Sequence, residues 1–141
     1  MGVGGPGRRG VPVVEKTLTV RAIGHAAAAQ SLACLAGRDP LGIMERHDIA
    51  ALAAAGQCFE VVAGDARAVY VLKVSHDIVN VEAAAGQGCG IDMVEVLNGV
   101  ICAQAQGLRE VTCHTARPGL LRKLKRHGWE LRGYIIGKKL A

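Results

Sequence analysis

Aromatic side chains are scarce in this 141-residue chain, which contains one Phe, two Tyr and one Trp. Proteins that bind single-stranded nucleic acid stack bases on aromatic rings, so this chain has few groups for that task. Half of the residues are nevertheless hydrophobic. The core of a domain of this length must therefore be built from Ala, Val, Leu and Ile.

Long apolar runs are absent as well. No run approaches the roughly 18 apolar residues of a membrane span. A secretory signal contains an apolar segment of about 7–15 residues, and the glycine-rich N-terminus contains no such segment. The sequence therefore predicts no membrane segment and a soluble protein of the cytoplasm.

The five cysteines show no metal-binding pattern. The sequence contains no C-x-x-C pair, and the adjacent Cys113 and His114 would point to opposite faces of a strand, so they could not share one metal ion. An odd number of widely spaced cysteines is typical of reduced thiols in a reducing compartment. We therefore expect no metal site.

Glycine, by contrast, is abundant, with nineteen residues. Residues 1–15 are rich in glycine and have no apolar face to bury, so they are expected to form a flexible leader. Residues 16–141 have the composition and length of a single domain. The expected organisation is therefore a leader followed by one domain.

Hydrophobic periodicity and turn residues divide this domain into strands and helices. Strands are expected at residues 16–23, 58–63, 68–74, 78–83, 110–115 and 131–136. Helices are expected at residues 26–36, 45–55 and 92–106, and from Pro118 to just before Gly128. Hairpin signals at residues 64–65 and 76–77 join the second, third and fourth strands into a meander. The predicted fold class is α/β, with a mixed sheet of about six strands flanked by about four helices.

A glycine-rich turn joins the fourth expected strand to the third expected helix. The turn reads Gln87-Gly88-Cys89-Gly90-Ile91, and Asp92 follows it. Backbone amides in such a turn can approach a phosphate, and the N-terminus of the helix behind it adds roughly half a positive charge. The turn is therefore a candidate site for the pyrophosphate of a nucleotide-type cofactor, and the alternative is a plain tight connection.

Positive charge is concentrated in the last quarter of the chain. Residues 109–141 carry nine basic and two acidic side chains, whereas the first 108 residues carry eight basic and ten acidic ones. Such a distribution suits an anionic partner: a phosphorylated cofactor, a nucleic acid or an acidic protein. The alternative is a solvated helix face followed by a basic tail.

The order of elements and the glycine turn resemble the GNAT superfamily of N-acetyltransferases over residues 18–140. Gln87 and Gly90 fit the first two fixed positions of the family's loop pattern Gln/Arg-x-x-Gly-x-Gly/Ala, with Gly88 at a free position between them. The amides of this loop hold the pyrophosphate of acetyl-CoA in that family. The ending of residues 124–129, followed by Gly133, is similar to the family's closing helix and last strand. The resemblance implies acetyl-CoA as cofactor, residues 87–91 as its binding loop, and Arg122 as a cation near its phosphates.

Three positions depart from the family pattern. Asp92 stands where a Gly or Ala normally ends the loop, and its carboxylate would repel a pyrophosphate unless it points outward as a helix cap. Leu124 stands where many of these enzymes carry a tyrosine that protonates the leaving thiolate. Arg117 stands where an asparagine is common. The segment from Arg117 to Ile136 also looks like small GNAT-like proteins of phages and prophages, many of which have lost the catalytic residues.

Glu82 is the candidate catalytic residue, because it lies beside the loop on the strand that resembles the family's central one. A carboxylate there could deprotonate an amine directly or through water. The alternatives are a solvated Glu or one paired to Lys73. His76 and His114 are expected to be ordinary surface or strand histidines, and Cys89 a small residue that fits the turn rather than a nucleophile.

Three functions follow from these observations. The first is an N-acyltransferase that uses acetyl-CoA on an unidentified amine. The second is a catalytically inactive structural or assembly protein of a phage or prophage, found in the cytoplasm or in the virion. The third is a basic nucleic-acid-binding module. The expected partners are acetyl-CoA or CoA, an acidic protein or a second copy of the chain, and nucleic acid for the third function.

Overall fold

The computed structural model describes residues 18–35, 49–88, 92–115 and 118–140. The chain begins with strand β1 (Leu18–Ile23), helix α1 (His25–Leu35) and helix α2 (Ile49–Ala54). Strands β2 (Gln57–Ala63), β3 (Ala66–Ser75) and β4 (Ile78–Gln87) follow. Helix α3 (Met93–Gln104), strand β5 (Glu110–Cys113) and helix α4 (Pro118–Lys125) complete the order. The predicted α/β class is confirmed.

The five strands form one mixed sheet in sequence order, β1-β2-β3-β4-β5. The first four strands pair antiparallel, and β5 pairs parallel to β4. Both predicted hairpin turns are present, with Gly64 and His76 in the left-handed conformation at φ 62° and 58°. The parallel step is made by α3, which carries the chain from the end of β4 back to the start of β5.

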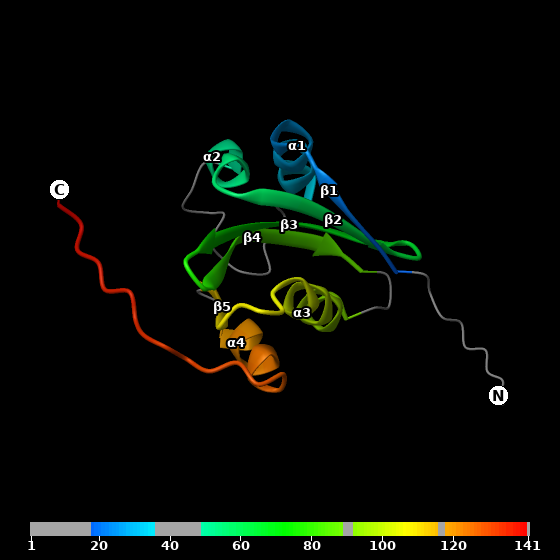
Figure 1. Cartoon of the computed structure of the whole chain (residues 1–141). Helices are drawn as coiled ribbons and strands as arrows, with labels where there is room; N and C mark the ends of the chain where they lie inside the picture. Colours follow the sequence, from blue (N-terminus) through cyan, green and yellow to red (C-terminus); the bar gives the residue numbers. More distant parts are fainter. Residues whose placement is uncertain (1–17, 36–48, 89–91, 116–117, 141) are drawn as a thin grey trace, which may run out of the picture.

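Two helical layers cover the sheet (Figure 1). α1 and α2 lie on one face, and α3 and α4 on the other. The α1/α2 layer packs small aliphatic residues such as Ala28 and Leu32, both fully buried. The α3/α4 layer packs Val100, Ile101 and other aliphatic residues against Tyr70, a fully buried tyrosine of β3. The core is thus aliphatic, as the composition requires.

The predicted strand at residues 131–136 is wrong. Residues 130–140 form no helix or strand, and each of them is exposed. The described part of the chain therefore contains five strands rather than six. Alternation of side chains makes a strand only when a neighbouring strand supplies backbone hydrogen bonds, and residues 131–136 have no such neighbour within the described ranges.

The leader expected at residues 1–15 lies wholly outside the described residues, and so do the first four residues of the helix expected at 45–55. The remaining boundaries differ from the predicted ones by a few residues, as frayed helix and strand ends do. Within the described residues, no helix is both long and apolar enough to cross a membrane.

Candidate active site

Glu82 occupies a β-bulge in strand β4. Val71 pairs with Ala83, and the next residue of β3, Leu72, pairs with Val81. Glu82 is therefore an extra residue of β4 that has no pairing partner on β3. Val81 belongs to the core beneath α3 and α4, whereas Ala83 belongs to the core beneath α1 and α2. The bulge therefore places Glu82 and Ala83 side by side on the α1/α2 face. Bulges often serve to re-aim a side chain in this way.

Two polar neighbours position the Glu82 carboxylate. Asn80 Nδ2 donates a hydrogen bond to Glu82 Oε2 at 2.7 Å, and Thr112 Oγ1 of β5 donates to Asn80 Oδ1 at 2.7 Å. All three side chains are partly buried. No ion pair joins Glu82 to Lys73 in the described structure, and Lys73 is exposed. The two hydrogen bonds that link Thr112, Asn80 and Glu82 fix the orientation of the carboxylate and leave it in contact with solvent.

Sequence reasoning missed Asn80 and Thr112. Asn80 had a readable signal, because it is a polar residue between Val79 and Val81 and shares the period-two face of Glu82. Thr112 had none, since its contact with Asn80 depends on the parallel register of β4 and β5, which pairs the two residues.

The pairing of β4 with β5 ends beside this carboxylate. Val81 and Cys113 form the last pair, and β4 then continues as far as Gln87, still paired with β3 but no longer with β5. On the α3/α4 face of the same point lies an apolar cavity of about 50 Å³, lined by residues that include Val81, Ala84, Leu97 and Cys113. This volume is far below the roughly 300 Å³ or more of pockets that enclose a drug-sized ligand. The cavity is suited to a small apolar group only.

The glycine turn starts where β4 ends. Gln87 is the last residue of β4 and lies opposite Arg67 of β3, while Gly88 follows it; both are exposed. The remaining three residues of the predicted loop, Cys89, Gly90 and Ile91, lie outside the described residues. Gln87 thus places an exposed amide at the carboxyl end of β4, and ligands of open α/β sheets bind at the carboxyl ends of strands.

Asp92 is the N-cap of α3. Its Oδ1 accepts hydrogen bonds from the amides of Val94 at 3.0 Å and Glu95 at 3.4 Å. Its backbone is extended, as an N-cap requires. Two of the amides that a helix N-terminus offers to an anion are therefore already used by a side chain of the protein itself.

Helix α4 separates its apolar and basic residues. Leu120 and Leu124 are buried at 8% exposure each, while Arg122, Lys123, Lys125 and Arg126 are exposed. The position at which the resemblance implies a catalytic tyrosine is thus a core leucine that cannot donate a proton. Arg122 makes no ion pair with another described residue. Within the described ranges Lys123, Lys125 and Arg126 also form no ion pair, so this helix face offers four cations to an anion.

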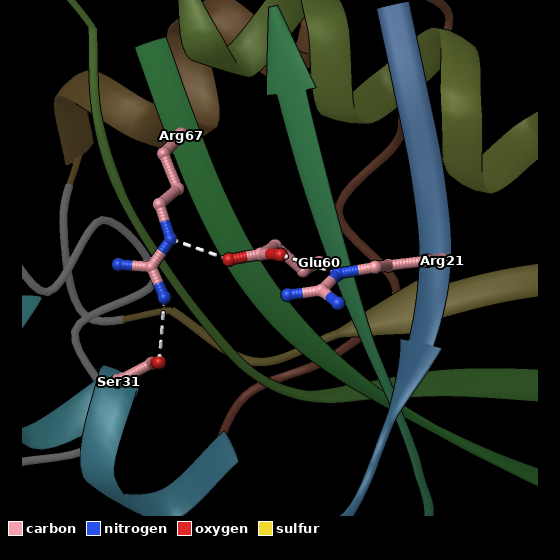
Figure 2. Close-up of polar contacts among 4 residues, drawn as sticks. All are labelled: Arg21, Ser31, Glu60 and Arg67. Carbon is pink, nitrogen blue, oxygen red and sulfur yellow. Dashed lines mark hydrogen bonds and ion pairs between the residues drawn. The ribbon is translucent and has the colours of Figure 1, made fainter. Parts of the chain in front are cut away.

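A buried carboxylate holds two arginines on the α1/α2 face (Figure 2). Glu60 of β2 accepts hydrogen bonds from Arg21 Nε at 2.7 Å and from Arg67 Nε, and its side chain is only 8% exposed. Arg67 Nη2 also donates to Ser31 Oγ of α1 at 2.7 Å. Hydrogen bonds from Arg67 first and Arg21 second lower the pKa of Glu60 below its ordinary value. The group ties β1, β2, β3 and α1 together, and sequence reasoning did not find it.

Cys58 and Cys113 are free thiols that are withdrawn from solvent, Cys58 fully and Cys113 in part. Burial raises the pKa of Cys113 to about 11 and also raises the pKa of Cys58. A thiol with a raised pKa stays protonated and is a poor nucleophile. Among the described residues no group of three or more His, Cys, Asp or Glu side chains is placed to hold a metal ion.

Comparison of the chain with protein-family models, with curated proteins and with solved structures finds no match.

Proposed function

We propose that this protein is a GNAT-like N-acyltransferase that moves a short acyl group, such as acetyl, from an acyl-CoA to an amine. The observation that carries the proposal is the β-bulge at Glu82, which puts an oriented carboxylate at the point where β4 and β5 stop pairing. A bulge breaks the ladder and is a feature often found beside active sites. Here the extra residue is acidic and partly buried.

The chemistry assigned to Glu82 is general base catalysis. The thioester supplies an electrophilic carbonyl, and an attacking amine must lose a proton as its nitrogen bonds to that carbon. Glu82 accepts this proton, while Asn80 Nδ2 holds the carboxylate in place. Leu124 stands where the resemblance implies a proton donor, and a leucine cannot protonate the departing thiolate. The thiolate therefore takes its proton from solvent. The absence of a proton donor at this position predicts a slow enzyme.

The small, mostly apolar cavity lies on the α3/α4 face, opposite Glu82 and beside the last β4–β5 pair. A base acts only within hydrogen-bond reach of the proton it takes, so the acyl carbon attacked beside Glu82 does not lie in this cavity. Residues 87–91 are the proposed anchor for the CoA pyrophosphate, and Arg122 the proposed cation. The described residues fit that role only in part, because Asp92 occupies two amides of α3.

The test separates binding from catalysis. We expect acetyl-CoA to raise the melting temperature through linkage, and Gly90→Glu to abolish the shift by placing a negative side chain in the proposed pyrophosphate loop. Glu82→Gln should keep the shift in melting temperature but lose the acetylation of a panel of primary amines. The release of free CoA thiol measures that acetylation. The matched control is Glu95→Gln, an exposed carboxylate on α3. Equal activity in both variants would exclude Glu82 as the base.

A second function is favoured by two specific observations. The Asp92 cap uses helix amides that a pyrophosphate needs, and Leu124 is a core residue rather than a proton donor. Both fit a GNAT-like chain that serves as a structural or assembly protein without catalysis. Absence of any thermal shift or calorimetric heat with millimolar acetyl-CoA or CoA would select this function over the enzyme.

A further inference from the structure

The end of the chain presents an unusual amount of apolar surface. We define residues 131–140 as the C-terminal segment; none of its residues belongs to a helix or strand. Its large apolar side chains are all exposed: Leu131 50%, Tyr134 85%, Ile135 71%, Ile136 92% and Leu140 88%. Elsewhere in the described structure only Leu18, Val20 and Val74 are large apolar residues with comparable exposure. Apolar surface concentrated in this way is a mark of an interaction site.

The beginning of this segment is fixed beside strand β5. Trp129 Nε1 donates to Asn98 Oδ1 of α3 at 2.8 Å, and the Trp129 amide donates to the Leu124 carbonyl at 3.2 Å. Arg132 Nη2 then forms an ion pair with Glu110 Oε2, at the first residue of β5, at 3.0 Å. Beyond this point the segment runs away from the sheet (Figure 1).

Strand β5 has an open edge at the same place. It lies at the end of the strand order, and the only strand that pairs with it in the described structure is β4. An edge strand presents unpaired N–H and C=O groups that can pair with another extended chain. The residues of the C-terminal segment suit such pairing, since Tyr and Ile favour strands.

We propose that the C-terminal segment adds as an extra strand to the β5 edge of a second copy of this chain, and that the exchange is reciprocal. A two-fold axis beside β5 would bring the β5 edges of the two copies close together. Each C-terminal segment, which starts next to its own β5, could then reach the β5 edge of the partner. Residues 133–140, fully extended, span about 26 Å at 3.3 Å per residue. Two strand spacings need only about 10 Å.

The anchoring of the C-terminal segment supports a second copy as the occupant. The C-terminal segment carries Arg132, Lys138 and Lys139 and no acidic residue. The β5 edge begins with Glu110, whose carboxylate already accepts a cation from this same segment. The ion pair holds Arg132 on its own domain, while residues after it point away from that domain. The segment is thus held at the start of its own β5, and its later residues lead away toward the equivalent edge of the partner.

The oligomeric state of the full chain tests the proposal. We expect a dimer by size exclusion with light scattering at 100 µM, dissociating on dilution. The double variant Tyr134→Lys with Ile136→Lys should weaken dimerisation at least tenfold. Val74→Lys, an exposed apolar position on β3, is the matched control and should leave the dimer intact. A synthetic peptide of residues 129–140 in excess should convert the wild-type dimer to a monomer carrying one peptide.

Two results would overturn the proposal. A wild-type chain that is monomeric at 100 µM would exclude the exchange, and protection of Ile136 from proteolysis in that monomer would show that the segment docks on its own β5 instead. A dimer that resists both the double variant and the peptide would be held by another surface. None of these results depends on acetyl-CoA, so the test is independent of the proposed enzymatic function.

Discussion

Replacing Glu60 with glutamine removes one negative charge from beneath α1 while keeping the size of the side chain. The carboxylate is 8% exposed, and it accepts hydrogen bonds from two arginines whose side chains are 67% and 41% exposed. Each charge-assisted hydrogen bond contributes about 1.5–3 kcal/mol. The amide oxygen of glutamine can still accept one of the two.

The magnitude follows from which partner is left buried. Removing one member of a fully buried ion pair costs about 3–5 kcal/mol, because an unpaired charge stays in the interior. Arg21 and Arg67 are not in that position, since both can turn their guanidinium groups to water. We therefore expect Glu60→Gln to lower the free energy of unfolding by about 2 kcal/mol at pH 7.

The pH dependence has a definite sign. Hydrogen bonds from Arg67 and Arg21 lower the pKa of Glu60 in the folded state from its ordinary value of 4.5. A lowered pKa contributes stability that is fully present above the unfolded value and is lost as the pH falls through the folded one. The difference between wild type and Glu60→Gln should therefore be constant from about pH 8 to 5 and shrink below pH 4.5.

Urea unfolding at a series of pH values measures this difference. The control is Asp77→Asn, which breaks the exposed pair with Arg109 and should change the stability much less than Glu60→Gln does. If both variants lose the same free energy, burial of Glu60 adds nothing to its pair. If the difference for Glu60→Gln does not shrink below pH 4.5, the carboxylate is not the group that stabilises this part of the sheet.

Three further changes test other parts of the structure. Asp92→Ala should lower the free energy of unfolding by about 0.5–2 kcal/mol through loss of the N-cap, and tighten CoA binding measured by calorimetry. A Cβ at Gly56 would lie 2.2 Å from a backbone oxygen of β3, so Gly56→Ala should lower the free energy of unfolding measured in urea. A Cβ at Gly99 would meet no atom within 4 Å, so Gly99→Ala should raise that free energy by up to about 1 kcal/mol. Lys123→Glu with Arg126→Glu should leave unfolding within about 1 kcal/mol of wild type but reduce retention on an anionic resin; unchanged retention would mean that these exposed charges bind nothing.

Local patterns predicted much of the fold. The turn at Gly64 and the one at His76 defined a meander, because each requires a left-handed residue between two alternating runs. A helix was expected to begin at Pro118, and α4 begins at that residue. Such features depend on residues close in sequence, so a single sequence contains them.

Features that depend on distant pairing could not be read in the same way. The bulge at Glu82 adjoins alanines 83–85, all buried in one core or the other, so no polar alternation reveals where the ladder shifts. Glu60 and Arg67 are seven residues apart, but Arg21 reaches Glu60 from 39 residues away. The segment at 131–136 has the residues of a strand without a partner in this chain's own described sheet. Sequence alone cannot tell a paired strand from an unpaired one.

The bulge also bears on how such a chain can change by descent. Val71 pairs with Ala83, and Leu72 pairs with Val81. Removing Glu82 alone would therefore join Val81 to Ala83, which already have partners on β3 and lie on opposite faces of the sheet. Every buried contact of β4 could remain, and only the carboxylate would be lost. Loss of a single codon would therefore turn the proposed enzyme into a bare scaffold, and gain of one would reverse the change. In this fold, catalytic and non-catalytic descendants would stand one codon apart.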